Sequence, residues 1–179
     1  PAFCPVSRQP ELKHTPVKIL RAELPWSLLA MAWLPEDQAL AVREALRALM
    51  PSFAFAACVP FGRERTGVLL RAASYDIPPD ELMTRIENLM GLCGADVLRY
   101  ADRRRGQRRA ARLVRSDADT RLDAFLLAGD TRAEAWIRAV LQDELPAQDY
   151  GRQLLAPGAT APVAVAPRSP QVCTCFNVG

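Results

Sequence analysis

The chain has 179 residues, 50% of them hydrophobic and 24% charged, which is typical of a globular protein and not of a disordered one. Its net charge is +3, a small excess that gives no indication of a nucleic-acid-binding surface. The longest apolar run, Trp26 to Leu34, is too short to cross a membrane, so we expect neither nucleic acid nor membrane as a partner. Five scattered cysteines do not suit a secreted disulfide framework, and they favour a cytoplasmic protein.

The first elements can be predicted from apolar periodicity. Residues 1–22 are interrupted by prolines, and only Thr15–Ala22 alternates enough to form a strand. Trp26–Trp33 is almost continuously apolar, as expected of a strand buried on both faces. A helix is predicted to begin at Pro35, where acidic residues follow, and to end before Pro51.

The same pattern then recurs. We predict strands at Phe53–Phe61 and Thr66–Ala73, a helix from Pro78 that is capped by Gly91, and a strand at Val97–Ala101. The resulting order, β-α-β-β-α-β, is the ferredoxin-like arrangement of an antiparallel sheet with two helices on one face.

Residues 102–112 contain six arginines in eleven positions. One interpretation is a solvated hairpin tip that joins the strand at Val97–Ala101 to a strand at Ala110–Val114. The other is a docking patch for phosphate or carboxylate groups, which the guanidinium fork suits. The segment contains no aromatic residues, so it gives no support to nucleic-acid binding.

The remaining elements complete the fold class. Leu122–Ala128 is predicted as a strand, and Thr131 and Glu134 have the spacing of a capping box at the start of another helix. We therefore predict an α+β domain at residues 23–156: a ferredoxin-like antiparallel sheet with helices on one face, plus an additional hairpin and helix. Residues 157–170, rich in Ala and Pro, are predicted to be a disordered C-terminal linker.

The predicted domain shows no catalytic motif. It has no phosphate-binding glycine loop, no serine-hydrolase elbow and no zinc-protease pattern. The one histidine, His14, has no second histidine to form a metal site or an acid–base pair. Cys58 lies in an apolar strand and is expected to pack as a small hydrophobic residue. We therefore expect no catalytic residue in this chain and interpret the α+β domain as a scaffold.

Cys173 and Cys175 form a C-x-C pair directly after the predicted linker. Two thiolates are half of a tetrahedral zinc site or of an iron–sulfur ligand set, because both need four ligands. The spacing alone also fits a redox dithiol or a chance occurrence. The apolar residues on both sides of the pair favour thiolates presented at the start of a small domain, and thiolates select zinc or iron–sulfur.

The segment Val-Cys-Thr-Cys-Phe-Asn-Val, residues 172–178, resembles the start of the small [2Fe-2S] domain related to bacterioferritin-associated ferredoxin. In that family a C-x-x-C pair roughly thirty residues further on completes the ligand set. The resemblance implies that Cys173 and Cys175 are cluster ligands and that residues 171–179 are the truncated start of such a domain.

The N-terminal segment Cys-Pro-Val-Ser-Arg-Gln-Pro-Glu-Leu-Lys-His, residues 4–14, resembles the tail of the molybdopterin-guanine-dinucleotide domain of bacterial assimilatory nitrate reductases. The resemblance implies that residues 1–22 are the tail of that domain and that Gln9 and Lys13 approach the cofactor. A lysine cation suits a pyrophosphate, and a glutamine amide can pair with pterin or guanine edges.

The middle of the chain resembles two enzyme families. Leu-Pro-Trp (24–26), Gly-Arg-Glu-Arg (62–65) and Ala-Gly-Asp-Thr-Arg (128–132) are similar to a domain of the assimilatory nitrate reductases, whereas Leu98–Leu141 also resembles a domain of flavin-dependent NAD(P)H nitrite reductases. The segment around Gln9 and Lys13 favours the molybdenum enzyme.

The resemblances together imply a C-terminal fragment of a molybdenum-dependent nitrate reductase. An electron-donor protein (a reductase subunit, ferredoxin or flavodoxin) would supply electrons through the [2Fe-2S] cluster to the molybdenum centre, which reduces nitrate to nitrite. Both cofactors would be incomplete in the fragment, which we expect to be inactive by itself. The alternatives are a fragment of the flavin-dependent nitrite reductase and a non-enzymatic ferredoxin-like regulatory or interaction module.

Overall fold

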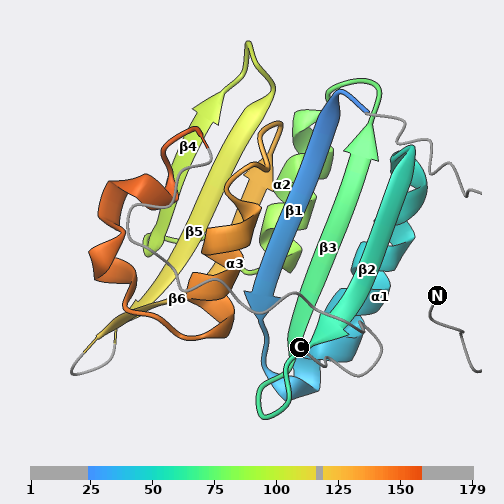
Figure 1. Cartoon of the computed structure of the whole chain (residues 1–179). Helices are drawn as coiled ribbons and strands as arrows, with labels where there is room; N and C mark the ends of the chain where they lie inside the picture. The colour runs from blue at the N-terminus through green and yellow to red at the C-terminus, as the bar shows by residue number, and fades with distance from the viewer. Residues whose placement is uncertain (1–23, 116–118, 159–179) are drawn as a thin grey trace, which may run out of the picture.

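The computed structural model describes residues 24–115 and 119–158, which form one six-stranded sheet. The strand order is β2-β3-β1-β6-β5-β4, and every neighbouring pair is antiparallel (Figure 1). The predicted α+β class is therefore confirmed. The strands are β1 (Trp26–Trp33), β2 (Phe55–Phe61), β3 (Gly67–Ser74), β4 (Val97–Asp102), β5 (Gln107–Arg115) and β6 (Thr120–Ala128).

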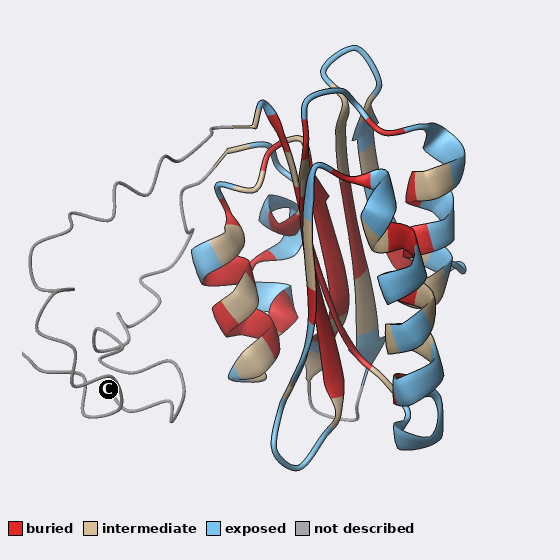
Figure 2. Ribbon diagram, turned by 90° about the vertical axis from the view of Figure 1, so that its right-hand side faces the viewer, coloured by how far each residue is buried: buried red, intermediate tan, exposed pale blue. Residues whose placement is uncertain are grey.

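Helices cover both faces of this sheet (Figure 2). Helices α1 (Glu36–Leu49) and α2 (Asp80–Leu89) lie on one face, as the ferredoxin-like pattern predicts, and α3 (Glu134–Gln142) adds a layer on the other face. Three short 3₁₀ helices follow α1 and α3 (Met50–Ser52, Ala147–Asp149 and Gly151–Leu154). Within the described residues, no helix is long and apolar enough to span a bilayer.

Strand β1 lies between the two cores. Its Leu28, Ala30 and Ala32 pack in the core under α1 and α2, whereas the alternate residues, among them Leu29 and Met31, pack in the core under α3. Successive side chains of a strand point to opposite faces, so a strand with a helical layer on each side must be apolar throughout. The prediction from the continuous apolar run is confirmed.

The position of β4 differs from a four-stranded ferredoxin-like sheet, in which the last strand pairs with the first. Here β6 pairs with β1, and β4 lies at the edge beside β5. Strand β6 is buried on both faces from Ala124 to Ala128, whereas β4 carries Arg99 and Asp102. An apolar strand gains more from a central position, and a strand with charges is better placed at an edge.

Local sequence determines the ends of helix α1, whereas contacts with distant residues form at the start of helix α3. Helix α1 starts directly after Pro35 and stops before Pro51, as predicted. The predicted capping box of α3 is wrong: Thr131 Oγ1 lies 3.0 Å from Ser27 Oγ, and Glu134 forms an ion pair with Arg71. Hydrogen bonds to strands β1 and β3 therefore replace the local cap.

Strand β2 has an exposed apolar side. Phe55 and Val59 are 56% and 46% exposed, because α3 packs on β6 and no other described helix covers this side of the sheet edge. On the opposite side Cys58 is buried under α1, which confirms its prediction as a small hydrophobic residue, and burial raises the pKa of its thiol.

Candidate functional site

The four residues that the sequence assigns to cofactors lie outside the described residues: Gln9, Lys13, Cys173 and Cys175. Their roles therefore stay predictions. In the ranges 24–115 and 119–158, no group of three or more His, Cys, Asp or Glu side chains is placed to hold a metal ion. The polar chemistry of the described residues is concentrated instead on the arginine-rich β4–β5 hairpin and the acidic residues around it.

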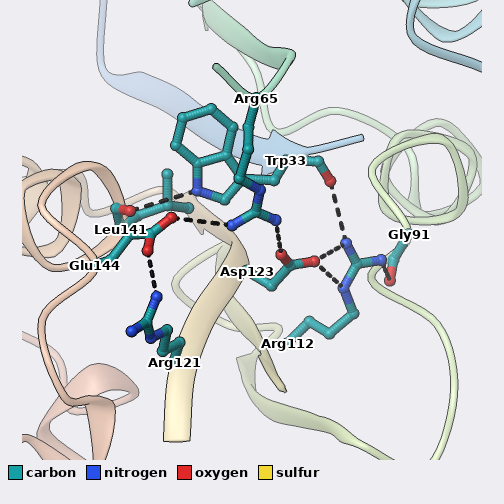
Figure 3. Close-up of polar contacts among 8 residues, drawn as sticks. All are labelled: Trp33, Arg65, Gly91, Arg112, Arg121, Asp123, Leu141 and Glu144. Atoms are coloured by element: carbon teal, nitrogen blue, oxygen red, sulfur yellow. Dashed lines mark hydrogen bonds and ion pairs between the residues drawn. The ribbon is translucent and has the colours of Figure 1, made fainter. Parts of the chain in front are cut away.

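Strand β5 directs Arg112 into an ion-pair network at one end of the sheet (Figure 3). Its Nε donates a hydrogen bond to Asp123 Oδ2 at 3.1 Å, and its Nη2 bonds the same oxygen. Its Nη1 and Nη2 also donate to the carbonyl oxygens of Gly91 (2.9 Å) and Trp33 (3.3 Å). One guanidinium thus joins β5, β6, the end of α2 and the end of β1.

Glycine is required at position 91 for two reasons, its backbone conformation and the close approach of Arg112. Its φ of +65° lies in the left-handed region, which side chains with a Cβ rarely adopt. A Cβ there would also lie 2.0 Å from Arg112 Nη1. The sequence correctly predicts Gly91 as a helix cap, but it gives no sign that the residue also makes room for an arginine.

The network continues to the segment that follows α3. Arg65 donates to Asp123 Oδ1 at 2.8 Å and to Glu144 Oε1 at 3.2 Å, and its Cζ lies 4.9 Å from the centre of the Trp33 ring (Figure 3). Arg121 pairs with the other oxygen of Glu144. Each acid is therefore shared by two arginines, a geometry that neutralises charge and connects the β2–β3 turn to the chain after α3.

A second arginine of β5, Arg109, is buried. The Arg109 side chain is 2% exposed, and its Nη2 lies 3.5 Å from Oδ2 of Asp130, whose side chain is 5% exposed. Arg109 Nη2 also donates to the Gly158 carbonyl at 3.2 Å, while the Gly158 N–H donates to Asp130 Oδ2 at 3.2 Å. This buried pair therefore binds both polar groups of Gly158.

Asp130 is held in its charged form by several donors. The Arg132 side chain donates to both carboxylate oxygens, at 2.9 and 3.0 Å, and this is the main reason that the pKa of Asp130 lies well below its ordinary value. Burial opposes that shift but does not overcome it. Burial also lowers the pKa of Arg109, and the charge of Asp130 partly offsets that effect.

The third cluster is the hairpin tip at the other end of β5. Arg103, Arg104 and Arg105 form the turn, and the backbone N–H groups of Arg104 and Arg105 donate to Asp102 Oδ1 at 3.0 and 3.2 Å. The Arg103 and Arg105 side chains are 86% and 71% exposed. Their closest acidic oxygens are 3.9 and 3.8 Å away, near the limit of an ion pair.

A cavity of about 220 Å³ lies beside this tip. Trp26 forms one wall, and its Nε1 donates to the Gly106 carbonyl at 3.0 Å. Gln107 also lines the cavity, and its side-chain Oε1 is buried from solvent without a hydrogen-bond donor among the described residues. The other lining residues are Ile77, Pro78, Asp80, Met83, Ala101, Asp102, Arg103, Gly106 and Arg108.

Sequence reasoning missed this cavity because its walls are far apart in the chain. Trp26 and Gly106 are separated by 80 positions, and only the sheet topology brings the start of β1 to the β4–β5 turn. The run of arginines was the one available signal, and it points to the hairpin but not to the cavity.

The fold and these clusters define an α+β domain with arginine-based ion pairs on both faces of one hairpin. No protein-family model, curated protein or solved structure matches the chain.

Proposed function

We propose that the chain is part of a molybdenum-dependent nitrate reductase that reduces nitrate to nitrite, and that the described α+β domain is a scaffold between two redox domains. The observation that carries this proposal is the order of motifs in the sequence. A segment with Gln9 and Lys13 precedes the domain, and the pair Cys173 and Cys175 follows it. We propose a cytoplasmic location for the enzyme.

The donor set of the C-terminal pair suits a [2Fe-2S] cluster. Cys173 and Cys175 supply two thiolates, and the remaining two ligands would come from a further C-x-x-C pair. A bound cluster supplies one-electron transfer between the donor protein and the molybdenum centre. Gln9 and Lys13 would bind the dinucleotide end of the molybdopterin cofactor through their amide and ammonium groups.

The geometry of the domain supports the scaffold role at one point. Arg109 and Asp130 bind the backbone of Gly158, the second residue of the predicted linker segment at 157–170. Both charged side chains are buried, so this attachment point lies against the sheet. A fixed attachment limits how far a tethered cluster domain travels from the rest of the enzyme.

The experiment uses the full-length protein that contains this chain. We expect molybdenum and iron in the purified protein, nitrate reduction with a reduced viologen dye, and a thiolate-to-iron absorption band that Cys173→Ser removes. The matched control is Cys93→Ser, because Cys93 is an exposed free cysteine in the described domain. An unchanged band and iron content in Cys173→Ser would show that the cluster assignment is wrong.

A further inference from the structure

We propose that the tip of the β4–β5 hairpin and the cavity beside it form a docking surface for an acidic segment of a protein partner, which inserts one apolar side chain. This inference is independent of the proposed nitrate reductase function. It rests on two observations: the exposed and weakly paired charge of the tip, and the size and lining of the cavity.

Among the described residues, the tip cations are only weakly paired with acids of the domain. Arg108, at the edge of the cavity, is paired with Asp80 and with Glu87 Oε1 at 3.3 Å. Asp102 accepts the two backbone N–H groups of the turn, so this carboxylate holds the loop in shape.

Arg103, Arg104 and Arg105 have no acid at close hydrogen-bond distance within the described residues. A surface with this excess of guanidinium groups attracts carboxylates, and the charge accelerates association.

The cavity favours a side chain over a free small molecule. Its volume of about 220 Å³ is below the usual range of sites for drug-sized ligands, roughly 300–1,000 Å³. Trp26 and Met83 form an apolar, buried part of the lining, and Ile77 is exposed at the rim. A single leucine-sized group would cover this apolar surface, and apolar anchors of this kind supply most of the affinity in protein interfaces.

Phosphate groups fit this site less well. Asp80 and Asp102 both line the cavity, and their carboxylates repel a dianionic phosphate that enters it. Carboxylates on a flexible segment can instead bind the arginines of the tip from outside the cavity.

The test measures fluorescence anisotropy of a labelled peptide added to this 179-residue chain. The peptide has one leucine between short runs of glutamate, and a second peptide has serine in place of the leucine. We expect the leucine peptide to bind about tenfold more tightly than the serine peptide, as expected from burial of one leucine side chain. The affinity should fall as the salt concentration rises.

Two variants separate the charge from the cavity. The triple variant Arg103→Ser, Arg104→Ser, Arg105→Ser should weaken both peptides by at least about tenfold. Ala101→Phe places a large ring on a cavity-lining residue of the edge strand β4, and it should abolish the difference between the two peptides. The matched control is Arg63→Ser, an exposed arginine in the β2–β3 turn at the opposite end of the sheet, which should bind like the unaltered chain.

Three results would overturn the proposal. The first is that the leucine peptide does not bind even at millimolar concentration. The second is equal weakening by the triple variant and by Arg63→Ser, which would mean a general charge effect. The third is binding of polyuridylate that the triple variant abolishes while peptide binding is unchanged, because the tip would then recognise nucleic acid. Urea unfolding of each variant verifies that it is folded.

Discussion

In the stem of the β4–β5 hairpin, Arg108, Arg109 and Arg112 are 20%, 2% and 19% exposed and contact acids on α2 or β6 or in the loop after β6. At the tip, Arg103 and Arg105 are mostly exposed and only approach acids at 3.8–3.9 Å. The two groups have the same side chain and lie within one short run. What differs is whether a neighbouring element brings a carboxylate within reach.

This difference has an energetic consequence. Removing one partner of a buried ion pair leaves the other charge without water and without a counter-charge, which is strongly unfavourable. Removing an exposed arginine leaves no buried charge without a partner, because solvent already surrounds the arginine and the acids near it. The stem arginines should therefore matter for stability, and the tip arginines should matter for binding only.

The largest effect is expected at the most buried pair. Asp130→Ala leaves the Arg109 guanidinium buried without its counter-charge and removes the acceptor of the Gly158 N–H. We expect the free energy of unfolding to fall by about 3–5 kcal/mol, measured by urea denaturation. Asp76→Ala is the matched control, because Asp76 is an exposed aspartate in the loop between β3 and α2, and the loss should be much smaller.

Asp123→Ala tests the network of Figure 3 and should have the second-largest effect. It leaves Arg112 and Arg65 without a shared carboxylate, but both arginines keep other acceptors. A loss of about 2–3 kcal/mol is expected in the same assay. Glu64→Ala, next to Arg65 in an exposed turn, should change stability by less than about 0.5 kcal/mol. Equal losses in the two variants would contradict the proposed role of the network.

Acid should weaken the stem through Asp130. Its pKa is lower in the folded chain than in the unfolded chain, so the folded state binds the proton less readily. The stabilisation is therefore fully present at neutral pH and decreases as the pH falls below about 4, the ordinary value of an aspartate. Urea unfolding from pH 7 to pH 3 should show a steeper loss for the unaltered chain than for Asp130→Asn, which has no carboxyl group to titrate. Parallel curves would mean that Asp130 does not contribute to acid sensitivity.

Elements defined by local sequence could be predicted. The starts of α1 and α2 follow from a proline and the acids after it, and β1 follows from its continuous apolar run. The predicted capping box does not form, because the Thr131 hydroxyl instead forms a hydrogen bond with Ser27, 104 positions away. Local signals cannot anticipate a partner that only tertiary structure supplies.

The candidate site could be predicted only in part. The run of arginines marked the hairpin, but the assignment of each arginine to stem or tip depends on where Asp80, Asp123 and Asp130 lie in space. Strand register decides this, because a shift of one residue would exchange the two faces of β5. Gln9, Lys13, Cys173 and Cys175 lie outside the described residues, so their assignment rests on sequence alone.

The smallest effect on stability is expected at the tip. The triple change of Arg103, Arg104 and Arg105 to serine should alter the free energy of unfolding by less than about 0.5 kcal/mol, because these side chains have only distant ion-pair partners. The backbone N–H groups that bind Asp102 remain in the variant, so the turn keeps its main contacts. Arg108→Ser is the matched comparison on the same hairpin, and it should cost about 1–2 kcal/mol because it removes the partner of Glu87 and leaves Asp80 with only the distant Arg103. A tip variant less stable than Arg108→Ser would mean that the exposed arginines hold the fold, and the division between stem and tip would fail. A stable tip variant that loses the acidic peptide would instead assign to these arginines a role in binding that their contacts within the domain do not explain.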